Sequence, residues 1–197
     1  MNTNSYITSA VATAITFLSV YIVTAETQNP WGAFSGNPRV ELLSDREVRL
    51  LDDFIFTTSD GETWNCPKDW IVDGASIPKI FWSVIGGPLD GKYRNASIIH
   101  DYACDMKKRP WKSVHLAFYK GMRCGGVPEA KAKLMYWAVY NFGPRWGLGG
   151  FFTSKSSEDA AHLPKTEEDV RQMLQFIEES EPSLEKLQTI KFVPILE

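Results

Sequence analysis

The sequence predicts an α+β fold: a small antiparallel β region followed by a cluster of three to four helices, with a signal or membrane helix at the N-terminus. Short β-rich runs separated by turn residues come first, segments with helical spacing follow, and an uncharged apolar stretch precedes both. The chain has 197 residues, of which 44% are hydrophobic. This is enough apolar material for one core, so we expect a single globular domain with tails.

The first 25 residues contain no charged side chain and include an apolar run from Ala10 to Val23. The end of this segment suits cleavage by a signal peptidase after Ala25. An uncleaved membrane anchor over residues 6–25 would have about the 20 residues that a bilayer needs, and a buried helix of the domain is a third alternative. A signal or an anchor would place the domain in the periplasm or another extracytoplasmic space, or hold it at the inner membrane.

Residues 26–38 contain two prolines, two glycines and two asparagines without periodicity, which predicts a linker. We expect the globular α+β domain to span residues 39–147 and to begin with short strands. The Asp60-Gly61 turn between β-rich runs predicts a hairpin. The expected strands are residues 40–43, 47–51 and 54–58, and a return strand that begins at Thr63.

Helical spacing of apolar residues begins in the second third of the chain. Ser76 is suited to cap a first helix, and Gly86 and Gly87 would end it. The next three helices should pack antiparallel because only short connections separate them. Residues 148–165 predict a loop, and the C-terminal segment 166–197 begins with an amphipathic helix that either docks on the domain or binds a partner. The expected later helices are residues 93–105, 111–123, 128–142 and 166–180.

The charge balance and the cysteines exclude some classes of protein. The chain has 21 basic and 24 acidic residues and no dense Lys/Arg block, which argues against nucleic acid as a partner. The cysteines Cys66, Cys104 and Cys124 are widely spaced and form no CxxC metal framework. In an oxidising compartment Cys104 and Cys124 would pair most easily, since both lie in neighbouring helical segments; isolated buried cysteines are the alternative.

Two of the three histidines fall on neighbouring expected helices. His115 lies four residues after Trp111 and three before Phe118, so it points into the apolar face of its helix. An imidazole buried there needs a partner, because leaving it unpaired would cost about 1–3 kcal/mol. The nearest candidates are His100 and Asp101 on the preceding helix. They flank the apolar face of that helix on opposite sides, so we expect His100 to be the buried site residue and Asp101 to reach it from the rim.

Asp73 is the fourth candidate, in the small-residue stretch Asp-Gly-Ala-Ser. Its carboxylate either faces a cavity or forms a turn that leads into the next helix. Together with His100 and His115 it would supply the ligand set of a metal site with an open position for water. A metal-free acid–base or hydrogen-bond network, and plain structural polarity, are the alternatives. Cys104 follows His100 by four residues on one helical face, which fits a Cys–His pair or an ordinary buried cysteine.

Four blocks occur in order along the chain: "VDGASIPKIFW", "GKYRNASIIHDYAC", "WKSVHLAFYKGMRCGGV" and "AKLMYWAVYNFGPRW". In these blocks the chain resembles the family called domain of unknown function 1353 (DUF1353), which is common in phages, prophages and bacteria. The resemblance covers about residues 65–147. It implies no established reaction, but the family's Asp-Gly-Ala-Ser, His-Asp-Tyr and later helix blocks match Asp73, His100, Asp101 and His115.

These observations predict an exported or membrane-anchored small hydrolase that depends on a divalent metal, most readily zinc. His100, His115 and Asp73 would hold the metal, and Asp101 would orient a histidine or act as a base. Arg145 and Trp146 would line the cleft, although the preceding Gly-Pro equally fits a structural corner. The compartment and the phage context suggest a cell-envelope polymer as the substrate. The alternative is a non-catalytic accessory or binding protein, derived from a phage or belonging to the envelope, in which the polar residues form a structural network.

Overall fold

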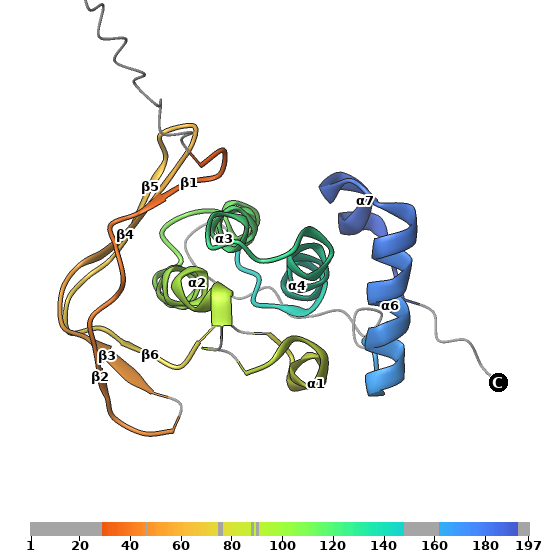
Figure 1. Cartoon of the computed structure of the whole chain (residues 1–197), viewed down its shortest axis with the longest axis horizontal. Coiled ribbons are helices and arrows are strands. Elements are labelled where there is room, and N and C mark those ends of the chain that lie inside the picture. The colour runs from red at the N-terminus through yellow and green to blue at the C-terminus, as the bar shows by residue number, and fades with distance from the viewer. Residues whose placement is uncertain are drawn as a thin grey trace, which may run out of the picture.

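The computed structural model describes residues 29–192, except residues 46, 75–76, 88, 90 and 148–161. The expected signal or anchor, part of the expected linker, the cap at Ser76 and most of the expected loop 148–165 lie outside the described residues. Within the described part of the chain, no helix combines the length and the apolar character that crossing a membrane requires. The described residues form an α+β fold of two small antiparallel sheets followed by helices (Figure 1), so the predicted class is confirmed.

The strands form two three-stranded antiparallel sheets, with the orders β1-β4-β5 and β2-β3-β6. The β4–β5 hairpin turns at Asp60-Gly61 as expected, because Gly61 adopts a positive φ of 86° that the turn needs. In β4 alternate residues are buried, so one face of this sheet covers the core. The bounds are β1 Gly32–Phe34, β2 Val40–Leu42, β3 Val48–Leu50, β4 Phe54–Thr58, β5 Thr63–Cys66 and β6 Ile71–Val72.

Strand β1 lies inside the segment that the sequence predicts to be a linker, so this part of the prediction was wrong. Gly32, with φ of 120°, pairs with Thr58. A Cβ atom at position 32 would lie 2.1 Å from the carbonyl oxygen of Thr57. Gly32, which the sequence places in a flexible linker, is therefore needed for the close approach of β1 and β4. The Asn29 side chain, just upstream, donates to the carbonyl of Cys124 over 3.0 Å.

The three central helices agree with the expected ranges within one residue at each end. The first expected helix is short, because Gly86 at φ of 94° ends it. The later part of the chain carries a further short helix that the periodicity did not indicate. The bounds are η1 Lys79–Phe81, α1 Trp82–Ile85, η2 Gly91–Tyr93, α2 Arg94–Met106, α3 Trp111–Cys124, α4 Glu129–Phe142, α6 Glu167–Ser180 and α7 Leu184–Thr189.

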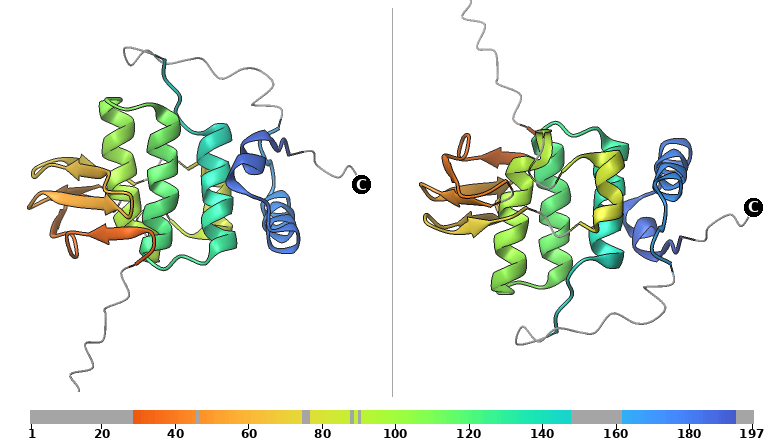
Figure 2. Two further views of the ribbon diagram at one scale, coloured as in Figure 1. Left: turned by 90° about the horizontal axis from the view of Figure 1, so that it is seen from above. Right: turned by 90° about the horizontal axis from the view of Figure 1, so that it is seen from below.

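Helices α2, α3 and α4 lie side by side as an antiparallel layer (Figure 2), with the sheets against α2 and α3 and with α6 and α7 against α4. One apolar core fills the space between the sheets and α2 and α3, and a second surrounds α4. Small residues let α2 and α3 approach closely, since a Cβ atom at Gly121 would lie 3.1 Å from that of Ala96. This contact brings the residues of α2 and α3 within hydrogen-bonding reach of one another.

The C-terminal helix α6 docks on the domain. The Thr166 side chain accepts from the backbone N–H of Asp169, and the Asp169 carboxylate accepts from the N–H of Thr166, which together form a capping box. Val170, Met173 and Ile177 are buried against the rest of the molecule. Of the two alternatives for this helix, docking is the one that the structure shows.

The three cysteines are free thiols. Cys104 lies near the end of α2. Because α2 and α3 are antiparallel, the part of α3 beside it is the start of that helix, around His115. Cys124 is the last residue of α3, and its thiol contacts the carbonyl of Gly32 instead. The Cys104–Cys124 disulfide considered from the sequence is therefore not formed, because the antiparallel arrangement separates the two residues.

Candidate functional site

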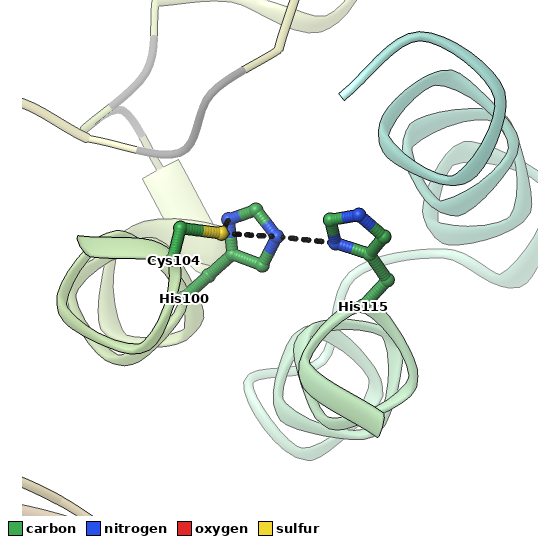
Figure 3. A group of neighbouring side chains, drawn as sticks. All are labelled: His100, Cys104 and His115. Carbon is green, nitrogen blue, oxygen red and sulfur yellow. Dashed lines mark hydrogen bonds between the residues drawn. The ribbon is translucent and has the colours of Figure 1, made fainter. Parts of the chain in front are cut away.

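His100 of α2 and His115 of α3 face each other in the interior, and 2.8 Å separates His100 Nε2 from His115 Nδ1 (Figure 3). Both are buried, with 1% of His100 and none of His115 exposed. Their rings lie among aromatic side chains, with Phe118 beside His100 and Trp111 edge-on to His115. The inward direction predicted for His115, and its meeting with His100, are what the structure shows.

The hydrogen bonds assign a proton to each ring. His115 Nε2 lies 3.1 Å from the carbonyl oxygen of Pro144. A carbonyl only accepts, so Nε2 of His115 carries the proton and Nδ1 is the acceptor. His100 must then donate from Nε2, which leaves its Nδ1 free to accept. The two rings are therefore not equivalent: His100 donates to His115, and His115 donates to the carbonyl of Pro144.

Cys104 completes the group from one turn further along α2. Its sulfur lies 3.8 Å from Nδ1 and 3.6 Å from Nε2 of His100, and 5% of the residue is exposed. Because Nε2 of His100 donates to His115, Nδ1 is the ring atom of His100 that can accept from the Cys104 thiol, and the contacts run from Cys104 through His100 and His115 to Pro144. We call His100, Cys104 and His115 the His–Cys–His cluster.

The members of the cluster are neutral at neutral pH. Burial, reinforced by the neighbouring His115, lowers the pKa of His100 well below its usual 6.5. Burial lowers the pKa of His115 to about 4, with the bond to Pro144 opposing this shift and the charge of Arg145 adding to it. Burial and the nearby carboxylates of Asp101 and Asp105 raise the pKa of the Cys104 thiol. The interior therefore disfavours every charged form of the cluster.

Asp101 is more deeply buried than the sequence indicated. Ser97, His100, Asp101 and Cys104 follow one another at helical spacing on one stripe of α2, and all four are buried. The expectation that Asp101 lies at the rim was wrong, because α2 is covered on more than its apolar face. The segment after β6 also packs on the stripe formed by these four residues, which we call the polar stripe. The Ser97 hydroxyl has no hydrogen-bond partner among the described residues.

The Asp101 carboxylate accepts hydrogen bonds from backbone amides of that segment. The N–H of Asp73 lies 3.0 Å from Asp101 Oδ2, and the amide of Gly74 also contributes. Burial raises the pKa of Asp101 to about 7, and the carboxylates of Asp73 and Asp105 add to this shift while the backbone bonds oppose it. Asp101 therefore holds a proton near neutral pH. Its charge acts on Cys104, although its carboxylate is not among the ligand atoms that lie within 4.8 Å of one another.

Asp73 is exposed, and its backbone rather than its carboxylate makes the contact to Asp101. Within the described part of the chain, the residues whose donor atoms lie within 4.8 Å of one another are His100, Cys104 and His115. Cys104 thus occupies the place in the group that the sequence assigned to Asp73. Its spacing of four residues from His100 was visible in the sequence, but only the packing of α3 against α2 brings His115 to the pair.

Arg145 and Trp146 hold the chain that follows α4. The Arg145 guanidinium donates to the carbonyls of Tyr140 and Asn141, at 3.0 and 2.7 Å. Trp146 is buried, and its indole N–H donates to the carbonyl of Arg109 over 2.8 Å. These contacts fit the structural corner that the Gly-Pro sequence also allowed.

The donor set of the cluster suits zinc. Thiolate and imidazole are ligands that zinc prefers over those chosen by magnesium or calcium. In a tetrahedral zinc site, two nitrogen ligands lie about 3.3 Å apart, and a nitrogen and a sulfur about 3.6 Å. The sulfur-to-Nε2 distance already has this value, whereas the two histidines would have to separate by about half an ångström.

The model of a family described as protein of unknown function (DUF1353) matches residues 48–139. The match confirms the resemblance to DUF1353. The DUF1353 segment begins with β3 and ends within α4, and it includes Asp73, Asp101 and the whole His–Cys–His cluster. Arg145, Trp146 and the C-terminal helices lie beyond it.

Two proteins of Sinorhizobium fredii, the uncharacterized proteins y4jT and y4iH, are similar to the chain. The similarity to y4jT is 45% identity over an alignment of 139 residues, which covers 68% of this chain and 41% of y4jT. The similarity to y4iH is 41% identity over 109 residues, which are 55% of this chain and 46% of y4iH. The chain therefore spans less than half the length of these two relatives. No solved structure matches the chain.

Proposed function

We propose that the chain is a zinc-dependent hydrolase that acts, exported or membrane-anchored, on a cell-envelope polymer. The observation that carries the proposal is the meeting of His100, Cys104 and His115, each of which offers a ligand atom within 4.8 Å of the other two. Three protein ligands leave the fourth position of a tetrahedral zinc for water, which is the arrangement of catalytic rather than structural sites. Zinc bound in this way lowers the pKa of its water towards 7 and so supplies a nucleophile at neutral pH.

Two neighbours on the polar stripe of α2 support a reaction at this place. The charge of the Asp101 carboxyl acts on Cys104, and this carboxyl exchanges its proton near neutral pH, which suits a general acid or base. The buried Ser97 hydroxyl has no partner among the described residues, and a water held at the cluster would supply one. Asp73 is exposed beside Asp101, so the polar residues extend from the interior to the surface.

The compartment and the substrate rest on the sequence. The uncharged apolar run of residues 6–25 supports export or anchoring, and a domain outside the cytoplasm meets envelope polymers such as peptidoglycan. A fusion of residues 1–28 to a reporter enzyme that works only after export tests the compartment. Export of the reporter is the expected result, and a reporter kept in the cytoplasm would contradict it.

Metal content tests the ligand set. The purified full chain should contain one zinc per molecule, and His115→Ala and Cys104→Ser should lose it. Cys124→Ser is the matched control, because that thiol is a half-buried cysteine outside the cluster, and this variant should keep the metal. Equal zinc in the Cys104→Ser and Cys124→Ser proteins would exclude the proposed site.

Activity tests the reaction. The zinc-loaded chain should release soluble fragments from purified peptidoglycan, and removal of the metal by a chelator should stop the release until zinc is restored. Asp101→Asn should lower the rate while zinc stays bound, whereas Asp52→Asn, an exposed carboxylate near Arg39, should not. Zinc binding without any release from peptidoglycan would leave a metal-binding domain and refute the substrate.

A non-catalytic accessory protein of the envelope is the second candidate. It is favoured by the completeness of the bonds from Cys104 to Pro144, because a buried network whose members are all paired stabilises one packing of the helices without metal. For this candidate the purified chain contains no zinc, and His115→Ala lowers the stability of the fold without affecting any metal-dependent property.

A further inference from the structure

The hydrogen bond of His115 Nε2 is made to the chain segment that follows α4. The Pro144 carbonyl that accepts from His115 Nε2 lies two residues beyond the last residue of α4. Between them, Gly143 donates its N–H to the carbonyl of Val139, and a Cβ atom at position 143 would lie 2.3 Å from that oxygen. Gly143 thus allows the chain to turn tightly enough to present Pro144 to α3.

Arg145 fixes this corner from its other side. Its guanidinium donates to two carbonyls at the end of α4, those of Tyr140 and Asn141. The guanidinium carbon lies 5.3 Å from the ring centroid of Trp111, and that ring packs edge-on to His115 with ring centroids 5.5 Å apart. Arg145 therefore connects the end of α4, the first residue of α3 and the surroundings of His115.

We propose that Arg145 is a positioning residue that locks His115 in the tautomer with its proton on Nε2, by holding the Pro144 carbonyl in place. The other tautomer would set the Nε2 lone pair against the carbonyl oxygen and leave two buried acceptors facing each other. Losing one buried hydrogen bond changes an equilibrium by roughly tenfold or more, so the locked tautomer predominates. In this tautomer Nδ1 of His115 is unprotonated and faces His100.

The consequence for the metal rests on the proposed function, whereas the tautomer does not. His115 would bind zinc through Nδ1 without any change in its protonation, because that atom is already an acceptor. His100 would bind through Nε2, so its proton would move to Nδ1, and Cys104 would lose its thiol proton to solvent. Zinc thus changes the tautomer of His100 and leaves that of His115 unchanged. The Pro144 carbonyl then orients a metal ligand from behind, a role typical of groups that support zinc-bound histidines.

Nitrogen-15 NMR of the full chain with labelled histidine tests the lock, since the shifts of the two ring nitrogens report which one is protonated. In the metal-free protein His115 should show protonated Nε2 and unprotonated Nδ1. Arg145→Gln should convert His115 to a mixture of tautomers, and Arg145→Lys should restore the pattern only in part because lysine lacks the forked donors. Arg171→Gln is the control, because among the described residues this arginine bonds to Glu167 on the exposed side of α6, and the variant should match the unchanged protein.

Zinc titration gives the second readout. Arg145→Gln should weaken zinc binding about tenfold, the lower end of what loss of a supporting group costs. The inference is overturned if His115 carries its proton on Nδ1, or if Arg145→Gln keeps the tautomer and the zinc affinity unchanged. A protein that shows the locked tautomer and binds no zinc refutes the proposed function alone. If Arg145→Gln does not fold, the ring shifts of the unchanged chain and of Arg145→Lys decide.

Discussion

The backbone N–H of Asp73 donates to the buried carboxylate of Asp101 over 3.0 Å and so attaches the end of β6 to the middle of α2. Burial raises the pKa of Asp101 to about 7, and the charges of the Asp73 and Asp105 carboxylates add to this shift. Asp101 therefore makes the stability of the fold depend on pH.

The sign of this dependence follows from the direction of the shift. The pKa of Asp101 is raised on folding, so the folded state holds the proton more tightly, and the stabilisation is complete below pH 4 and lost as the pH rises through 7. Asp101→Asn mimics the protonated carboxyl. Between pH 4 and pH 8 the natural protein should lose about 4 kcal/mol of unfolding free energy relative to the variant. Urea denaturation of both proteins at several pH values measures the difference between their unfolding free energies. The two histidines give an opposite pH dependence, but they are present in both proteins, so their contribution cancels in this difference. Parallel curves would show that Asp101 is ionised throughout.

Zinc binding should release one proton, from the Cys104 thiol. His115 is already unprotonated at Nδ1, and the proton of His100 only moves within its ring. Calorimetric titration at pH 6, in buffers that differ in ionisation enthalpy, counts the protons, because at this pH zinc-bound water with a pKa near 7 stays largely intact. The Asp101→Asn background removes the contribution of that carboxyl. A count of zero or two protons would contradict the assigned protonation states.

Gly32→Ala should destabilise the protein by at least about 2 kcal/mol, because the new Cβ atom would lie 2.1 Å from the Thr57 carbonyl oxygen and strain the positive φ. Gly36→Ala is a matched control: its φ is 130°, but no atom lies within 4 Å of the added Cβ. Thermal unfolding of both variants separates the steric contact from the backbone strain. Equal losses would mean that the contact with Thr57 adds nothing to the cost of the backbone strain.

Thr166→Ala should lower the unfolding free energy by about 1 kcal/mol through loss of the capping box of α6. Glu178→Ala, at an exposed position of the same helix, should change it by less than about 0.5 kcal/mol. Chemical denaturation followed by tryptophan fluorescence measures both. If Thr166→Ala left the main transition unchanged, α6 would unfold independently of the domain.

The central helices and the histidine pair could be predicted because both depend on periodicity. The apolar positions of α3 place His115 inward, and a short connection places α2 beside it. Strand β1 could not be predicted from periodicity, since its three residues are too few for an alternating pattern.

The partners of the histidines depended on packing that no local pattern contains. The choice between Asp73 and Cys104 follows from the way the segment after β6 meets α2: the backbone N–H of Asp73 donates to Asp101, and the Asp73 carboxylate is not part of the group formed by His100, Cys104 and His115. The burial of Asp101 has the same origin. A helical wheel shows which residues share a face, but it does not show how many faces the rest of the chain covers.

The bonds from Cys104 through His100 and His115 to Pro144 cross from α2 to α3 and on to the residues after α4. Opening any one of these three segments leaves a buried donor or acceptor unpaired in its neighbour. Their backbone amides should therefore exchange with solvent deuterium in one concerted event, and the three segments should behave as a single cooperative unit of the folded state.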